Sequence, residues 1–365
     1  LAAAMLPATA KDFDERGFIC FQNGVLNVKT GELLPHSPDL KFTKAMTYNF
    51  NPAAKFPDWD TFQLKASSNN PDIVAAKQRL FGACLSGAPD RLIIISFGAT
   101  GTGKSAESNA ILGALEAFGD IINPDLLAGG NNTNSDRLPQ EMKRHMGKLL
   151  ISSSEMKEDS RWNAEIKRLS GGDAVGARAL REEFETLKPT FTLHVHTNYK
   201  PSANGDEALM ARFRIIPYYY KFVDSPEKMT LEQVGELYSS PEAKEYIFQW
   251  LYNGYKMYQE TGAGYDVLPG IMQELISEYQ ESEDIFGLWL SENCDIVNGF
   301  WTSGKELHND YAKYCTDNGD KSLNPRRFFK ELEKRGFRSE KRSHNVKWFK
   351  GLILSASIPG DDNDF

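Results

Sequence analysis

The sequence of 365 residues predicts an α/β fold built around a parallel sheet. A β-branched apolar run from Leu92 leads directly into a glycine-rich loop, and a helical pattern follows the loop. Two further apolar segments, 148–155 and 191–198, each end in a polar residue. Strands of a parallel sheet deliver polar side chains to a ligand in this way, at the carboxyl edge of the sheet. We therefore expect a ligand-binding core over residues 90–222.

An α+β accessory region is predicted for residues 1–89, before this core. Apolar runs at 18–21 and 25–28 flank Asn23-Gly24, a pair typical of a hairpin turn. Helical spacing follows over 73–85. The N-terminal region should therefore contain a small antiparallel sheet and at least one helix.

The glycine-rich loop follows the pattern G-x-x-x-x-G-K-[ST], which binds phosphates. Its backbone N–H groups and the N-terminus of the next helix favour an anion. Lys104 is expected to reach the β- and γ-phosphates, and Ser105 to offer its hydroxyl to Mg²⁺. A chance glycine-rich turn is the alternative. The expected cofactors are ATP and Mg²⁺, and the expected nucleotide-binding residues are Gly98, Ala99, Thr100, Gly101, Thr102, Gly103, Lys104 and Ser105.

Polar residues at the ends of the next two strands are candidates for catalysis. Glu155 could polarise the attacking water and join the metal shell; alternatively it is a surface acid, with Glu158 or Asp159 equally suitable. Asn198 could hold the attacking water or sense the γ-phosphate, or it could simply begin a turn. Glu155 and Ser105 are thus the predicted metal-binding residues.

Two arginines precede the next apolar strand. Arg212 and Arg214 alternate with apolar residues, so both should lie on one face of the strand. An arginine projecting from this position can reach the γ-phosphate site of a neighbouring subunit. Ordinary salt bridges are the alternative. We assign the catalytic role to Arg212.

The remaining third of the chain is predicted to be a helical segment, 223–290, and a basic winged-helix-like domain, 291–365. Residues 321–350 hold eleven Lys or Arg and three Glu, a net charge of +8 in a chain whose total is −8. Such a block is a candidate nucleic-acid surface, although a solvated helical face would look similar. The predicted DNA-binding residues here are Arg326, Arg327 and Lys330.

Taken in order, these motifs resemble those of superfamily 3 helicases, and specifically the phage and plasmid primase–helicases related to the poxvirus uncoating helicase. The resemblance includes the phosphate loop, Glu155, the segment 166–178 with Gly171-Gly172-Asp173, Thr197-Asn198 and Arg212. The N-terminal turns and Pro57-Asp58-Trp59 look like the accessory domain of that family. The resemblance covers about residues 15–225.

This family implies an AAA+-like ATPase ring, usually a hexamer, that pulls single-stranded DNA through its centre. Glu155 matches the catalytic acid, Asn198 the polar sensor and Arg212 the arginine that acts in trans. The sequence departs from helicases with paired acids, because Ser154 precedes Glu155. The family also has a DNA-gripping hairpin, which matches residues 175–192. Its basic residues here are Arg178, Arg181 and Lys188, although three glutamates crowd the expected turn.

The leading hypothesis is an ATP-dependent DNA helicase, the motor part of a replicative primase–helicase that acts on single-stranded or forked DNA. The alternative is a ring-forming loader or remodeller that uses ATP without unwinding DNA. A small-molecule kinase is disfavoured by the pattern at Asn198 and Arg212. The chain does not begin with Met, so we expect a primase or polymerase domain upstream. No apolar run approaches the ~20 residues of a membrane span, so no membrane segment is expected. The four cysteines lie far apart in the sequence without a C-x-x-C pair, which favours a reducing intracellular compartment.

Overall fold

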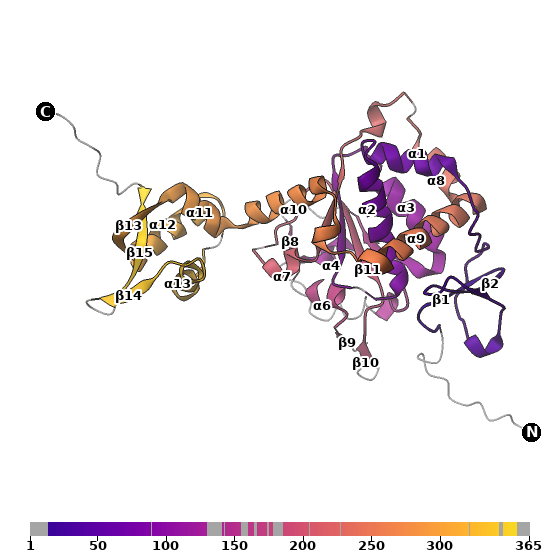
Figure 1. Ribbon diagram of the computed structural model, residues 1–365, viewed down its shortest axis with the longest axis horizontal. Coiled ribbons are helices and arrows are strands. Elements are labelled where there is room, and N and C mark those ends of the chain that lie inside the picture. Colours follow the sequence, from indigo (N-terminus) through magenta and orange to yellow (C-terminus); the bar gives the residue numbers. More distant parts are fainter. Residues whose placement is uncertain are drawn as a thin grey trace, which may run out of the picture. The chain divides into compact units, whose positions relative to one another are not determined.

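The computed structural model divides the chain into two compact units, Leu1–Glu278 and Tyr279–Phe365 (Figure 1). Each unit is described by itself. The residues that the structure describes are 14–88, 90–129, 141, 143–154, 160–163, 166–173, 175–177, 185–203, 205–226, 228–320, 322–342 and 346–355.

The first unit contains a five-stranded parallel sheet, which confirms the predicted α/β fold class. Its strands are ordered β12-β4-β11-β7-β5 across the sheet. The central three are β4 (Ile93–Gly98), β11 (Thr192–Thr197) and β7 (Leu150–Ser153), and the outer two are β12 (Phe213–Tyr218) and β5 (Gly119–Ile122). All neighbours pair in parallel, so the carboxyl ends of the strands meet at one edge.

Helices cover this sheet, so the side chains of its central strands are almost all buried. Ile95 of β4 pairs with Val195 on one side and with Ile215 on the other, and all three side chains are buried. Strands of a parallel sheet are buried on both faces, which explains why the sequence shows continuous apolar runs there. The phosphate loop leaves β4 at the carboxyl edge and leads into α3 (Lys104–Leu115).

The predicted helical segment after the core is broken into two helices, α8 (Leu231–Ser239) and α9 (Pro241–Thr261). Ser240 lies between them, in extended conformation, and its hydroxyl accepts a hydrogen bond from the N–H of Ala243. Pro241 then occupies the first turn of α9, where its missing N–H costs nothing. The predicted helical segment therefore contains a break at Ser240.

Helix α2 (Pro71–Gly82) crosses α9 at two glycines. A Cβ atom on Gly82 would lie 2.3 Å from the backbone nitrogen of Tyr255, and one on Gly254 would lie 1.9 Å from the carbonyl oxygen of Gln78. Only glycine fits at either position, because real Cβ atoms do not approach so closely. The two helices thus meet backbone to backbone.

The N-terminal part of this unit contains the predicted antiparallel sheet, formed by β1 (Phe18–Phe21), β2 (Gly24–Asn27) and β3 (Leu33–Leu34). It is followed by α1 (Pro57–Ala66). Phe21 of β1 packs edge-on against Phe248 of α9, with ring centroids 4.8 Å apart. The predicted accessory region and core lie in the first unit, as does the predicted helical segment as far as Glu278, whereas residues 279–290 of that segment belong to the second unit.

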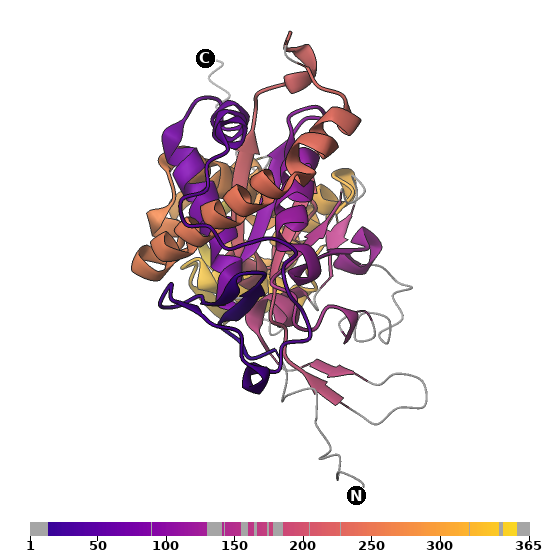
Figure 2. The ribbon, with the colours of Figure 1, turned by 90° about the vertical axis from the view of Figure 1, so that its right-hand side faces the viewer.

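Shorter elements complete the first unit. A two-stranded ribbon of β9 (Val175–Ala177) and β10 (Glu185–Leu187) projects from the sheet in both views (Figures 1 and 2). This ribbon begins the hairpin that the sequence predicted over 175–192. The other elements are η2 (Pro38–Leu40), η3 (Ala83–Ser86), η4 (Glu116–Phe118), α4 (Pro124–Leu127), β6 (Ala128–Gly129), β8 (Arg161–Trp162), α6 (Ile166–Gly171), α7 (Glu207–Met210), η5 (Phe222–Asp224) and η6 (Tyr265–Val267).

The second unit has its own apolar core around Trp289, Phe328 and Phe349. Helix α10 (Gly270–Glu283) crosses the division at Glu278/Tyr279. Asp284 then caps α11, because its carboxylate accepts the N–H of Gly287 at 2.9 Å. The prediction treated 272–289 as one helix, and this cap divides it into two.

The order of elements in the second unit is helix, strand, two helices and two strands. They are α11 (Ile285–Asn293), β13 (Cys294–Ser303), α12 (Gly304–Asp317), α13 (Pro325–Lys334), β14 (Ser339–Arg342) and β15 (Val346–Leu354). The sheet order is β13-β15-β14, with antiparallel neighbours. This order includes two helices followed by closing strands, as expected for a winged-helix-like domain. Residues 346–354 form one strand, β15, which pairs with β13 on one side and with β14 on the other.

Candidate nucleotide-binding site

The glycine-rich loop has the backbone that a phosphate-binding loop requires. Gly101 and Gly103 have φ angles of +83° and +89°, a region that side chains strongly disfavour. These turns connect the buried strand β4 to α3, whose first residue is Lys104. The N-terminal end of a twelve-residue helix therefore opens directly onto the loop.

Lys104 joins the loop to the neighbouring strand. Its amine donates hydrogen bonds to the carbonyl oxygens of Gly98 and Ala99, at 2.6 and 2.8 Å. It also donates to the side-chain oxygen of Asn198 at 2.9 Å, and Asn198 in turn donates to the hydroxyl of Thr100 at 3.0 Å. The residue is 6% exposed, so its charge is held close to the loop. The structure thus brings together Lys104 and Asn198, two of the predicted catalytic residues.

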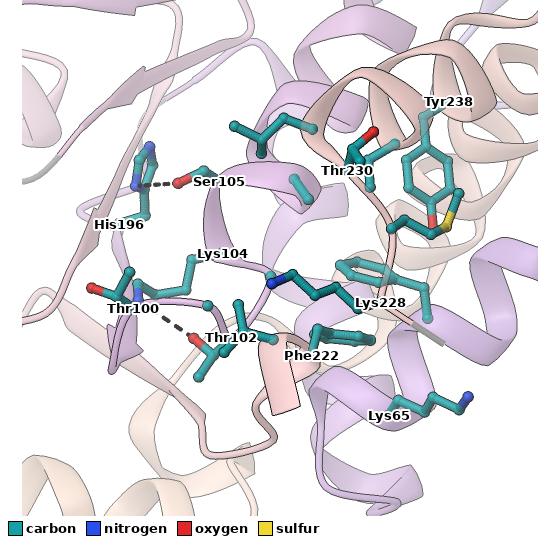
Figure 3. Close-up of a pocket in the computed structure, with 18 of the residues that line it drawn as sticks. Lys65, Thr100, Thr102, Lys104, Ser105, His196, Phe222, Lys228, Thr230 and Tyr238 are labelled. Atoms are coloured by element: carbon teal, nitrogen blue, oxygen red, sulfur yellow. Dashed lines mark hydrogen bonds between the residues drawn. The ribbon is translucent and has the colours of Figure 1, made fainter. Parts of the chain in front are cut away.

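A cavity of about 780 Å³ lies over the loop (Figure 3). This volume is in the range of small-molecule sites. Its polar side is formed by loop residues 100–106 with Ser154, His196, Thr197 and Asn198. Its other side is formed by α1 and by residues 222–238, and is largely apolar. Ser154 directly precedes Glu155, which lies outside the described residues, as do Glu158 and Asp159.

His196 is a residue of this cavity that the sequence analysis missed. Its Nδ1 lies 3.5 Å from the hydroxyl of Ser105, as Figure 3 shows. Burial and the nearby charge of Lys104 lower the pKa of His196 to about 4, so the ring is neutral at pH 7. A signal was available, because side chains alternate along a strand and His196 is two residues from Asn198.

A chain of buried hydroxyls runs beneath the cavity through a second histidine. The two ring nitrogens of His194 contact the hydroxyls of Ser96 at 3.0 Å and Ser152 at 2.9 Å. Ser152 contacts Ser108 of α3 at 2.7 Å. Burial, the neighbouring His196 and Lys77 hold the pKa of His194 well below its ordinary value. A neutral imidazole with one donor and one acceptor satisfies both contacts.

A buried ion pair connects α2 to the helix of the phosphate loop. The amine of Lys77 lies 2.9 Å from the carboxylate of Glu107, and the two side chains are 0% and 1% exposed. Glu107 is in the first turn of α3, three residues after Lys104. The pKa of Lys77 is lowered by burial, and the carboxylate opposes this shift. The pair fixes the start of α3 against the accessory region.

Arg212 lies far from this cavity along its own strand. It directly precedes β12, at the amino end, whereas the phosphate loop follows the carboxyl end of β4. The half-buried guanidinium donates to the carbonyl oxygen of Lys167 and to the hydroxyl of Ser170, the latter at 2.9 Å. Burial and nearby Arg91 lower the pKa of Arg212. The structure therefore does not bring Arg212 into the cavity of its own chain.

The side chain of Arg214 forms hydrogen bonds that stabilise the backbone around β12. Its guanidinium donates to the backbone carbonyls of Ala211, Phe213 and Ala263, at 3.0, 2.8 and 2.6 Å. These contacts connect β12 to the segment that follows α9.

The predicted DNA-binding residues fall into two groups. Arg178 and Arg181 lie outside the described residues, and Lys188 is exposed one residue after β10. Arg326, Arg327 and Lys330 are exposed on α13 in the second unit.

Comparison with known proteins gives three findings. The family model described as "D5 N terminal like" matches residues 1–67. A protein of Acanthamoeba polyphaga mimivirus named "Putative helicase L207/L206" is 23% identical over an alignment of 303 residues that covers 77% of this chain and 31% of that protein. The chain therefore spans about a third of the length of this relative.

Solved structures of the NrS-1 C-terminal region are also similar. One matches with a TM-score of 0.49 and 13% identity, covering 87% of this chain and 82% of that one. A second apo structure of the region, residues 305–718, matches with a TM-score of 0.48 and 12% identity over 84% and 79% of the two chains.

The fold and the site define an α/β protein with a phosphate-loop-like core. The family match and the viral relative confirm its resemblance to the D5-like primase–helicases, which the motif order had indicated. Among the residues that the structure describes, no helix has the length and apolar character needed to cross a membrane.

Proposed function

We propose that the chain is an ATP-dependent DNA helicase, the motor part of a primase–helicase that moves along single-stranded DNA as a ring. The observation that carries this proposal is the contact between Lys104 and Asn198. It joins the phosphate loop to the end of a neighbouring strand, where a sensor of the γ-phosphate is needed. The resemblance to a viral helicase supports the same function.

The described residues fit a nucleoside triphosphate with Mg²⁺. The described partners of the Lys104 amine are the carbonyl oxygens of Gly98 and Ala99, the hydroxyl of Thr102 and the amide oxygen of Asn198, and a phosphate can replace the Asn198 oxygen as its partner. Ser105 is exposed beside the loop, where a hydroxyl can bind the metal, and Glu155 would complete that shell. Mg²⁺, when bound, neutralises charge on the phosphates. Asn198, released from Lys104, would then hold the attacking water or the γ-phosphate.

Arg212 is proposed to act on the nucleotide of a neighbouring subunit in a ring.

 Its half-buried guanidinium lies at the amino end of the sheet, where a second copy can approach without passing the first copy's loop. An arginine supplied across a subunit boundary stabilises charge that develops on the transferred phosphate. A ring of this kind, with six copies as the expected number, places one such arginine at each boundary.

DNA contacts are proposed for two places. Lys188 and the β9–β10 ribbon would line the centre of the ring, and the exposed cations of α13 would contact duplex or forked DNA. Both sets would bind phosphates without reading the base sequence, so affinity should fall as salt is raised.

A strand-displacement assay tests the motor function. Forked DNA with a single 3′ or 5′ tail is incubated with the chain, ATP and Mg²⁺, and Lys104→Ala serves as the inactive control. We expect unwinding of one fork only, and neither hydrolysis nor unwinding by Lys104→Ala. Hydrolysis and ring assembly without displacement of either strand would favour the loader or remodeller instead.

A subunit-mixing experiment tests the role of Arg212. Arg212→Ala and Glu155→Gln should each lack DNA-stimulated hydrolysis when alone. A mixed ring contains some intact boundaries. At these boundaries the Arg212→Ala copy supplies Glu155, and the Glu155→Gln copy supplies Arg212. Mixing should therefore restore part of the activity, and no recovery in rings shown to be mixed would contradict action in trans.

A further inference from the structure

The three-stranded sheet of the second unit has two faces of different character. Its central strand is β15, with β13 on one side and β14 on the other (Figure 1). Phe349 and Leu352 of β15 are fully buried in the apolar core that α11, α12 and α13 complete. Side chains alternate along a strand, so Trp348 and Lys350 lie on the face away from this core. We call it the outer face of the sheet.

Two tryptophans on the outer face share one guanidinium. The register places Trp301 of β13 opposite Lys350, and therefore on the same face as Trp348. Arg342 of β14 lies opposite Val346, again on this face. Its guanidinium carbon is 4.1 Å from the ring centre of Trp301 and 5.5 Å from that of Trp348. Arg342 is exposed and both tryptophans are half-buried, so a partner can reach this stack of flat groups.

Charged side chains surround the stack, and most of them are cations. Arg338 directly precedes β14, and its carbonyl oxygen accepts the N–H of Lys350 at 2.9 Å, so both residues belong to the outer face. Both are exposed. Glu340, also exposed, lies opposite Trp348 on the same face, and Asp295 lies at the far end of β13, beyond the irregular register. Around the stack, three cations therefore accompany one carboxylate.

The cations of the outer face differ from a neighbouring lysine that has a structural role. Lys347, which alternates with Trp348 along β15, pairs with the carboxylate of Glu333 at 2.5 Å. Arg338, Arg342 and Lys350 form no ion pair with any other residue that the structure describes. Their positive charge therefore remains available to an anionic partner.

We propose that the outer face binds single-stranded DNA, with bases stacked on Trp301, Trp348 and Arg342 and phosphates beside Arg338 and Lys350. Unpaired bases expose flat faces, which stack on aromatic rings and on guanidinium planes. The surplus of cations matches the charge of the phosphates. In a duplex, by contrast, each base is already stacked between its neighbours. The proposal goes beyond the proposed function, because this surface uses neither the phosphate loop, nor the β9–β10 ribbon, nor the cations of α13.

Tryptophan fluorescence of the full chain reports on this surface directly. The other four tryptophans of the chain are at most 5% exposed, namely Trp59, Trp162, Trp250 and Trp289. Only Trp301 and Trp348 can therefore stack on a base. Titration with oligo-dT of about 12 nucleotides, without ATP and at low salt, should quench the fluorescence. A blunt-ended duplex of the same length should not.

Two substitutions act in opposite directions. Trp301→Leu keeps Trp348 as the reporter, and its Kd for oligo-dT should rise about tenfold because one stacking contact is lost. Phe300→Leu is the matched control, since Phe300 is 54% exposed on the same strand and alternates away from the stack. Glu340→Gln should instead strengthen binding, a gain that poor folding cannot produce. Its control is Glu306→Gln, at an exposed position of α12.

Each other outcome overturns the proposal. Unchanged fluorescence while a labelled oligonucleotide is fully bound, as judged by its anisotropy, would place the DNA elsewhere on the chain. Equal quenching by the duplex would show that the bases are not stacked on this face. A smaller number of subunits for Trp301→Leu, with an unchanged Kd for oligo-dT, would assign the face to contact between copies. Failure of the proposed function is distinguishable, because Lys104→Ala should show the same quenching as the unsubstituted chain.

Discussion

Asn198 holds the amine of Lys104 through a neutral oxygen, and this neutrality is what lets a phosphate compete for the amine. A carboxylate at the same position would form an ion pair with Lys104 and would repel the triphosphate. In the proposed function, entry of the nucleotide therefore depends on this amide.

Asn198→Asp is therefore expected to weaken ATP binding by about tenfold or more, as the cost of a charge-assisted contact implies. Asn198→Ala should bind ATP nearly as well as the unsubstituted chain but hydrolyse it slowly. Titration calorimetry with ATP and Mg²⁺ measures the first effect, and a steady-state ATPase assay the second. Equal binding by both variants would contradict this role of the amide oxygen.

The two histidines of β11 give the fold a dependence on pH. The pKa of His196 is lowered from 6.5 to about 4, and that of His194 is also lowered. As pH falls below about 6.5, the unfolded chain takes up protons that the folded chain does not. The free energy of unfolding should therefore decrease between pH 6.5 and 4, by at most about 1.4 kcal/mol per pH unit for each histidine.

Urea unfolding at several pH values measures this slope. His196→Asn should make the slope shallower in the same window, because one of the two groups no longer titrates. An identical slope in the variant would show that His196 does not contribute. Carboxylates with lowered pKa values, such as Asp120, act at lower pH and leave the comparison unchanged.

At the scale of single residues, the sequence predicted the phosphate loop and Asn198 because both depend on local pattern: a fixed spacing of glycines, and a polar residue at the end of an apolar run. His196 follows the same alternation, but its environment depends on α3 and on Lys104, which come together only in the folded chain. The position of Arg212 follows from strand order, which no local pattern shows.

At the scale of the elements, helices α2 and α3 are connected by the buried ion pair between Lys77 and Glu107 inside an apolar core. Removing only one member of a buried ion pair leaves the other charge without compensation. Lys77→Met should therefore lower the free energy of unfolding by about 3–5 kcal/mol. The double variant Lys77→Met/Glu107→Leu should recover most of this loss, since both charges are then absent.

Chemical denaturation of the two variants measures the difference. Arg144→Met is the control, because Arg144 pairs with Glu141 at the surface and is 63% exposed. Loss of such a pair costs at most about 1 kcal/mol. If Lys77→Met were as mild as this control, the ion pair would not be what fixes α3.

The elements that the sequence predicted well are those with long, regular patterns, such as α3 and β11. Helix breaks at Ser240 and Asp284 were missed because apolar spacing continues across both, while a single capping side chain ends the hydrogen-bond pattern. Strand β5 has only four residues, and β13 has buried residues only at its two ends and an irregular register, so neither has a clear alternating pattern.

For the whole molecule, charge is divided unevenly: residues 321–350, within the second unit, hold eleven Lys or Arg and three Glu in a chain whose total charge is −8. Four cations of α13 are exposed, and three of them, Arg326, Arg327 and Lys330, are the predicted DNA-binding residues. If they contact phosphates, each contributes to the dependence of binding on salt. The helix itself is stabilised by the apolar core around Phe328, so the cations are not needed for folding.

Replacing these three residues by Gln should weaken binding to forked DNA and lower the slope of log affinity against log salt by about 2–3. The ATPase rate without DNA should not change. The control is the replacement of three lysines of the first unit by Gln, namely Lys29, Lys41 and Lys55. These lysines are exposed, and their replacement removes the same amount of charge. Fluorescence anisotropy with a labelled fork measures both sets; equal effects would make α13 an ordinary solvated surface.

Of the features considered, domain organisation was the hardest to predict from the sequence. The winged-helix-like order of the second unit follows from two amphipathic helices and a closing strand, which the pattern of the tail showed. The assembly of the accessory region, the core and α9 into one unit depends on contacts between distant parts of the chain, such as that of Phe21 with Phe248.

The meeting of Gly82 and Gly254 has a consequence for how such proteins can diverge. Two backbones in contact leave no room for side chains that could compensate for a change. The N-terminal part therefore cannot be replaced by that of a related protein unless α9 is replaced with it. A protease cut between α2 and β4 should, for the same reason, leave two fragments that remain associated and co-purify.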